Sequence, residues 1–180
     1  MTPPTVPVTC PIRGYRKFSI YPTTSTGSKI WLNSGSRLAY TDFANTTSRE
    51  VYLEGEAFFD VTGNKRKPFI VHTSHLKLKV LGTKFNVKSY PSEKITETIL
   101  VSGKVEIEEL NASSENKQQI TLRPFQKATY SVTTGKIAVD DKKTASYMKP
   151  QVPSKIEIIE KINPELYTSW KDDKLIFSNE

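Results

Sequence analysis

The chain reads VYLEGEAFFDVTGNKRKPFIVHTSHLKLKVLGTKFNVKSY over residues 51–90, and three strand patterns follow one another there. In the first pattern apolar residues alternate with mostly polar ones, which is the period of a β-strand that buries one face. Gly55 occupies a place in the apolar row without contributing a side chain. The rest of that row consists of Val51, Leu53, Ala57, Phe59 and Val61.

The last of these patterns changes phase. Its apolar row is even-numbered from Leu76 to Val80 and odd-numbered from Phe85 onward. A shift of one residue turns a buried row outward unless the backbone absorbs it. We therefore predict a bulge or a sharp bend at Gly82–Thr83. The charged stretch Gly63–Pro68, between the first two patterns, is predicted to be a hairpin tip.

Short apolar runs separated by turn residues continue on both sides of this stretch. Turns are predicted at residues 26–27, 33–36, 102–103 and 133–135, where Gly or Asn can supply a positive φ. No sustained helical period occurs before about residue 140. The sequence therefore predicts an all-β fold, either a twisted two-sheet sandwich or a solenoid-like stack of hairpins. The residues expected to fix this framework are Gly35, Gly55, Phe59, Gly82, Phe85 and Gly103.

Composition and charge limit the range of possible functions. The chain has 180 residues, of which 36% are hydrophobic, so it can form one sizeable core. The net charge of +7 lies in the first half, where lysines such as Lys77, Lys79, Lys84 and Lys88 alternate with apolar residues. That spacing is typical of a solvated sheet face, with an acidic protein partner as the alternative. It does not resemble a nucleic-acid-binding module.

None of the candidate catalytic or metal-binding sets is convincing. His72 and His75 are the only histidines, and Cys10 is the only cysteine, so no zinc pattern is present. The carboxylates of Glu54, Glu56 and Asp60 share one strand, but alternation places acids outward on any half-buried strand. We therefore expect no enzyme activity and no cofactor.

Four motifs occur in a characteristic order: LNSGSRLAY from residue 32, then LEGEAFFDV, PFIVHTS and VLGTKFNVKSY. Together they resemble the periplasmic domain of FecR-type anti-sigma factors. A further motif over residues 164–180, with Tyr167 and Trp170 ahead of LIFSNE, resembles the start of the short STN-like subdomain that closes such proteins. Family members usually have Gly or Asn where Phe125 stands, so we expect that turn to differ in type or Phe125 to be held by packing.

The resemblance implies a division of the chain. Residues 1–20 would be an N-terminal lead or linker, residues 21–148 the FecR-like all-β domain, residues 149–163 a linker, and residues 164–180 the beginning of a truncated α+β, STN-like subdomain. It also implies that the chain is the soluble exterior of a single-pass protein, on the periplasmic face of the inner membrane. No apolar run in the chain approaches the roughly 20 residues that cross a bilayer.

Partners are likewise implied by the resemblance. They are the N-terminal signalling domain of a TonB-dependent transporter, a sigma factor reached through a cytoplasmic region absent from this chain, and periplasmic and intramembrane proteases. Neither nucleic acid nor direct membrane insertion by this segment is expected. The residues expected to meet the partner are Trp170, Leu175 and Phe177, with Trp31 and Tyr52.

A second hypothesis is a carbohydrate-binding β-sandwich. Such a module needs exposed aromatic side chains on one concave face. Trp31, Tyr52 and Phe58 occupy strand positions whose side chains are expected to point away from the core. The same three residues could instead form a second layer of the core.

Overall fold

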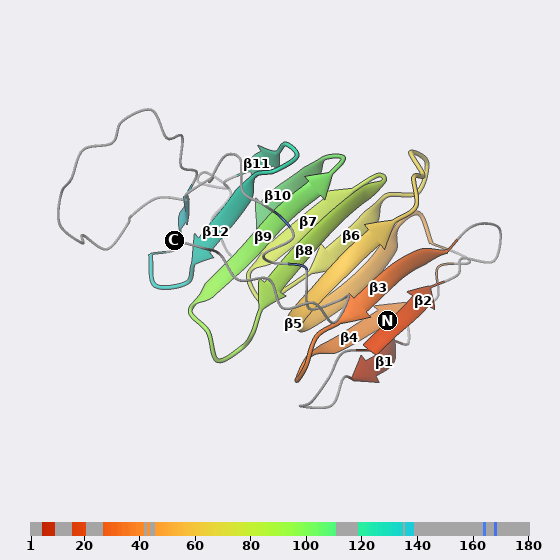
Figure 1. The fold of residues 1–180 in the computed structure, drawn as a ribbon, viewed down its shortest axis with the longest axis horizontal. Helices are drawn as coiled ribbons and strands as arrows, with labels where there is room; N and C mark the ends of the chain where they lie inside the picture. Colours follow the sequence, from red (N-terminus) through yellow and green to blue (C-terminus); the bar gives the residue numbers. More distant parts are fainter. Residues whose placement is uncertain are drawn as a thin grey trace.

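The computed structural model describes residues 27–41, 43, 46–110, 119–134, 164 and 168, together with the backbone of three further strands at 5–9, 16–20 and 136–138. Thirteen strands occur in this part of the chain, linked into one hydrogen-bonded network (Figure 1). In chain order they are β1 (Thr5–Thr9), β2 (Arg16–Ile20), β3 (Ser28–Leu32), β4 (Arg37–Thr41), β5 (Arg49–Val61), β6 (Phe69–His72), β7 (Leu76–Val80), β8 (Thr83–Ser89), β9 (Ile95–Ser102), β10 (Val105–Glu109), β11 (Gln119–Leu122), β12 (Lys127–Ser131) and β13 (Lys136–Ala138).

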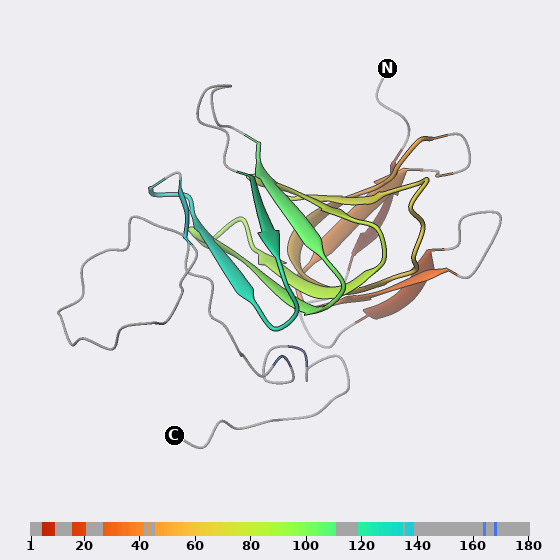
Figure 2. The same cartoon turned by 90° about the horizontal axis from the view of Figure 1, so that it is seen from above.

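The network is folded into two sheets that face each other, as the view from above shows (Figure 2). Sheet A has the order β1-β4-β5-β6-β7-β10-β11. Sheet B has the order β2-β3-β5-β8-β9-β12-β13. The predicted all-β fold is therefore confirmed, in its two-sheet sandwich form.

Strand β5 belongs to both sheets. Its first part pairs with β4 and, in parallel, with β6, whereas from Gly55 onward it pairs with β8 and then β3. Gly55 has a φ of +105°, and a Cβ at this position would lie 2.8 Å from the Cα of Ser36. Both the backbone angle and the close approach require glycine. Gly55 is thus the point at which the chain passes from sheet A to sheet B.

The next three connections that cross between the sheets are stacked on one another. They follow β5, β7 and β9, and each contains a glycine: Gly63, Gly82 and Gly103. A Cβ on Gly82 would lie 2.6 Å from the Cα of Gly63, and a Cβ on Gly103 would lie 2.7 Å from the carbonyl oxygen of Gly82. The predicted hairpin tip at Gly63–Pro68 is wrong, because β5 and β6 pair in parallel and this loop crosses between sheets.

The change of phase at Gly82 also arises because the chain crosses from one sheet to the other. Strand β7 lies in sheet A and β8 in sheet B, so each presents its own apolar row to the shared core. The predicted sharp bend is confirmed as a crossing turn. A register shift occurs slightly later, where β8 meets β9 between Lys84 and Phe85.

The core fills the space between the sheets. Phe59 and Phe85, both fully buried, stack with ring centroids 4.9 Å apart. Arg49 is also buried and is held against the loop between β5 and β6, donating hydrogen bonds to the carbonyl oxygens of Lys67 and Thr62. Burial lowers the pKa of its guanidinium. The stretch predicted as a lead, residues 1–20, contributes β1 and β2 to the two sheets.

Candidate functional site

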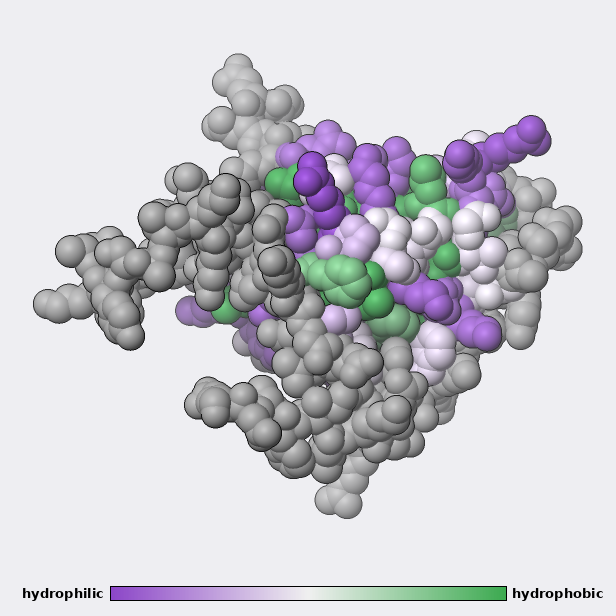
Figure 3. Space-filling model, turned by 45° about the horizontal axis from the view of Figure 1, so that its top comes forward, coloured by the Kyte–Doolittle hydropathy of each residue, from purple (hydrophilic) through white to green (hydrophobic). Residues whose placement is uncertain are grey.

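Four lysines of the outer faces form ion pairs with acidic neighbours. On sheet A, Lys77 and Lys79 of β7 pair with Glu108 and Glu106 of β10, at N–O distances of 3.9 and 3.5 Å. On sheet B, Lys84 pairs with Asp60 at 3.1 Å and Lys88 with Glu93 at 3.0 Å. The side of the molecule in Figure 3 accordingly shows hydrophilic and hydrophobic residues interspersed. All four lysines singled out in the sequence are ion-paired, as a solvated sheet face predicts.

The three carboxylates singled out in the sequence, Glu54, Glu56 and Asp60, have different surroundings. Glu54 lies in the sheet A part of the strand, whereas Glu56 and Asp60 lie in the sheet B part. Asp60 is bound to Lys84. Glu56 accepts hydrogen bonds from the side-chain amides of Asn33 and Asn86, both at 2.8 Å. These carboxylates do not form a joint acid–base pair.

The two histidines also have different neighbours. His72 stacks on Tyr52, and its Nε2 lies 3.1 Å from a carboxylate oxygen of Glu50. The hydrogen bond from Ser48 is the main cause that lowers the pKa of Glu50. His75 stacks instead on Tyr130, with centroids 5.8 Å apart. Within the described residues no group of three or more His, Cys, Asp or Glu side chains is placed to hold a metal ion.

A network of polar side chains that sequence reasoning missed joins the turn of sequence LNSGS, residues 32–36, to β5. The backbone N–H of Glu56 donates to the hydroxyl of Ser36 at 2.8 Å, and the Tyr90 hydroxyl donates to the carbonyl oxygen of Ser34 at 3.0 Å. Gly35 has a φ of +67°, which lets the turn place Ser36 under Gly55. The motif therefore holds the point where β5 changes sheet, which explains its residue types in structural terms.

A second buried polar pair lies at the far end of the core. The Tyr130 hydroxyl donates to a carboxylate oxygen of Glu109 at 3.1 Å, and both side chains are buried. Burial, reinforced by this bond, raises the pKa of Tyr130 to about 12. The pair therefore fixes β12 against β10 while the tyrosine stays protonated.

The three outward aromatic residues are divided between the sheets. Trp31 and Phe58 lie together on sheet B in an edge-to-face contact, with centroids 5.6 Å apart, whereas Tyr52 lies on sheet A. Phe58 is only 4% exposed, and with Trp31 it lines a cavity that Pro164 and Thr168 also line. The single aromatic face that the carbohydrate-binding hypothesis required is therefore not present.

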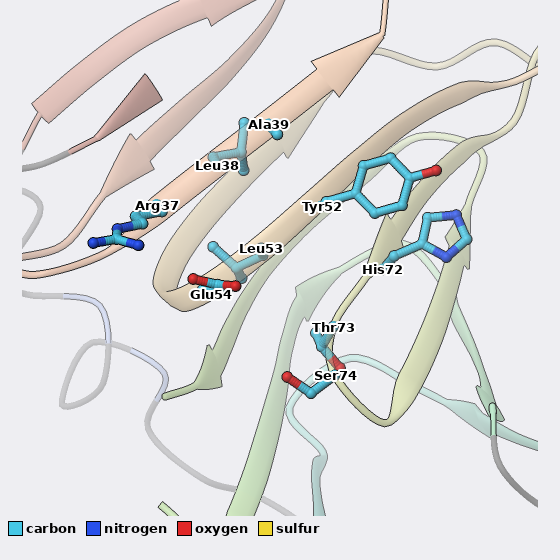
Figure 4. Close-up of a pocket in the computed structure, with 9 residues that line it drawn as sticks. All are labelled: Arg37, Leu38, Ala39, Tyr52, Leu53, Glu54, His72, Thr73 and Ser74. Atoms are coloured by element: carbon cyan, nitrogen blue, oxygen red, sulfur yellow. The ribbon is translucent and has the colours of Figure 1, made fainter. Parts of the chain in front are cut away.

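A recess opens on sheet A beside Tyr52 (Figure 4). Its volume is about 390 Å³. It lies where β5 parts from β6, between Leu53–Glu54 on one side and Thr73–Ser74 on the other. The remaining predicted partner-contact residues, Trp170, Leu175 and Phe177, are outside the described residues.

Comparison with known proteins identifies the domain. Among the described residues, none of the candidate catalytic or metal-binding sets is assembled in one place. Residues 22–106 match the model of the family described as FecR protein. The resemblance seen in the motifs is therefore confirmed: residues 22–106 are similar to the FecR family.

Solved structures agree with this assignment. Two crystal structures of a "putative anti-sigma factor" from Parabacteroides distasonis are similar, at 29% and 30% identity with TM-scores of 0.65 and 0.64. The matches cover 74% and 73% of this chain but only 58% and 57% of those chains, which is less than two thirds of their length. No curated protein sequence matches the chain. In the described part of the chain, no helix has the length and apolar character needed to cross a membrane.

Proposed function

We propose that this chain is the sensor region of a transmembrane anti-sigma factor. The observation that carries the proposal is the FecR match over residues 22–106, which coincides with the part of the sandwich from β3 to β10. The similarity to the anti-sigma factor structures, which extends over about three quarters of the chain, supports the same role. We expect this region to regulate without catalysing a reaction.

The signal would come from outside the inner membrane. In this proposal the chain lies on the periplasmic face and receives the N-terminal signalling domain of a TonB-dependent transporter. Binding of the signalling domain then leads periplasmic and intramembrane proteases to release an ECF sigma factor. That sigma factor is held by a cytoplasmic region outside this chain. The chain would affect transcription only indirectly, through the sigma factor, so it needs no surface that binds nucleic acid.

We place the transporter contact in the C-terminal part, at Trp170, Leu175 and Phe177, by addition of a strand to a sheet edge. Strand addition uses main-chain hydrogen bonds for affinity and side-chain pockets for specificity. Single surface substitutions should therefore weaken binding only modestly. Deletion of residues 170–180 should abolish it.

A titration tests this proposal. The purified chain, with and without residues 170–180, is titrated by calorimetry with the isolated signalling domain of the transporter encoded beside its gene. We expect saturable binding that the deletion removes. If neither form binds, this chain does not receive the transporter signal.

The same titration locates the contact. If both forms bind equally, the β-sandwich itself holds the contact. Binding through the basic first half should then weaken steeply as salt rises, because exposed charges are screened over about 8–10 Å at ordinary ionic strength.

A further inference from the structure

We propose that the recess beside Tyr52 on sheet A is a binding site for a neutral saccharide. The site is created by the departure of β5 from sheet A. Strands β5 and β6 pair only as far as Tyr52 with His72, and β5 next pairs with β8 from Gly55. The turn after β6 bends away, fixed by a hydrogen bond from the Thr73 N–H to the carbonyl oxygen of Leu76 at 2.9 Å. A gap in the sheet results.

Tyr52 forms a preorganised aromatic wall. Its ring stacks on His72 with centroids 4.8 Å apart and an interplanar angle of 15°, and Glu50 holds His72 from the other end. Tyr52 nevertheless remains 43% exposed. Its neighbour across β4 is Ala39, whose methyl group leaves open the space beside the ring. A large, rigid aromatic surface is therefore held towards solvent, and it loses little conformational freedom when it meets a ligand.

Polar groups of both charges lie beside this wall. Arg37 and Glu54 are directly opposite each other across β4 and β5, two residues along from Ala39 and Tyr52 on the same face. Both side chains are exposed, and neither takes part in a hydrogen bond or an ion pair with another described residue. Ser74 adds a hydroxyl from the opposite side of the recess, as Figure 4 shows. The rim thus offers a donor, an acceptor and a hydroxyl.

A saccharide is the ligand class that uses all of these features at once. A sugar ring carries C–H groups on its faces, which pack on an aromatic ring, and hydroxyl groups on its edge, which both donate and accept hydrogen bonds. Glu54 can accept from such hydroxyls while Arg37 donates to them, and hydrogen bonds to charged groups are the stronger kind. A ligand with net charge would meet one of these side chains as a like charge, which disfavours it. The volume of about 390 Å³ lies at the small end of ligand pockets and suits a monosaccharide or disaccharide.

The inference is independent of the relay role, because binding is measured on the isolated chain without any transporter or sigma factor. The probes are maltose, cellobiose, lactose and mannobiose, with sialic acid and a tyrosine-containing dipeptide for comparison. Binding is followed by calorimetry and by the NMR resonances of Tyr52 and His72. We expect at least one neutral disaccharide to bind with a Kd below about 1 mM.

Variants assign binding to the recess. Tyr52→Ala should weaken it by about tenfold or more, whereas Tyr52→Phe, which keeps the ring, should retain it. Ala39→Leu should weaken it similarly by filling the space beside the ring while leaving Tyr52 in place. The control is Phe125→Ala, since Phe125 is exposed to a similar extent, 49%, in the turn before β12.

Three outcomes would overturn the proposal. The first is that no neutral disaccharide binds. The second is that binding survives both Tyr52→Ala and Ala39→Leu. The third is that the dipeptide or sialic acid shifts the Tyr52 and His72 resonances and the disaccharides do not, in which case the recess would accept a protein side chain or an anion instead.

Discussion

Replacing Gly55 by alanine should destabilise the fold more than the same substitution at Gly35. A side chain at φ +105° costs about 1–3 kcal/mol. The new Cβ would lie 2.4 Å from the Ser36 hydroxyl and 2.8 Å from its Cα, so the backbone of the LNSGS turn must move. That movement breaks the part-buried hydrogen bond from the Glu56 N–H to Ser36, and the loss of such a bond costs about 1 kcal/mol or more.

Alanine also restricts the unfolded chain, which offsets about 0.4–1 kcal/mol of the loss. The net destabilisation should be about 2–4 kcal/mol, a large part of the total stability of an ordinary domain. Urea unfolding followed by circular dichroism measures it. The matched control is Gly35→Ala, because Gly35 also has a positive φ, +67°, but has open space where a Cβ would stand. If Gly55→Ala is no less stable than Gly35→Ala, the contact with Ser36 does not fix the sheet change.

Three further predictions concern other parts of the sandwich. Gly82→Val should lower the free energy of unfolding by about 1–3 kcal/mol, because its Cβ would lie 2.6 Å from the Cα of Gly63; an unchanged urea midpoint would show that the crossing turns are not in contact. Phe125 has a φ of +67°, so Phe125→Asn should be about 1 kcal/mol more stable than Phe125→Ala in the same urea assay, since Asn tolerates this conformation; equal stabilities would contradict a strained turn. Because the folded pKa of Tyr130, about 12, exceeds the ordinary value of 10.0, its contribution to stability is complete below pH 10 and is lost as pH rises towards 12. Tyr130→Phe should therefore lose less melting temperature between pH 10 and pH 12 than the unaltered protein. An identical loss in both proteins would refute the raised pKa of Tyr130.

Alternation predicted the core well, because the side-chain direction in a strand depends only on local backbone geometry. Val51, Phe59, Leu78 and Val87, from three apolar rows in β5, β7 and β8, are fully buried. The bend at Gly82 followed from the change of phase between the rows of β7 and β8. What the phase could not reveal is that the two rows belong to different sheets, since strand pairing is set by contacts far apart in the chain.

Contacts between distant residues also decided which predictions about the candidate functional residues held. The side chain of Phe58 points outward from the core, as its position in the strand predicted, yet it is only 4% exposed, and Pro164 and Thr168 line the cavity beside it. Gly55 was recognised as a gap in an apolar row, but its contact with Ser36 joins residues that only the folded chain brings together. The Phe125 turn was expected to change type or to be secured by packing. Instead Phe125 adopts the positive φ itself and stays 49% exposed.

The most direct test of the central claim is a sigma-dependent reporter in cells that carry the native gene. Deleting the codons for residues 5–138 from the full-length protein removes all thirteen described strands while leaving its other regions in place. If this chain is the sensor of an anti-sigma factor, reporter output in the deletion strain should no longer change when the transporter is induced. The control variant Phe125→Ala, at an exposed residue outside the proposed contacts, should respond normally. An inducer response of normal size in the deletion strain would contradict the claim.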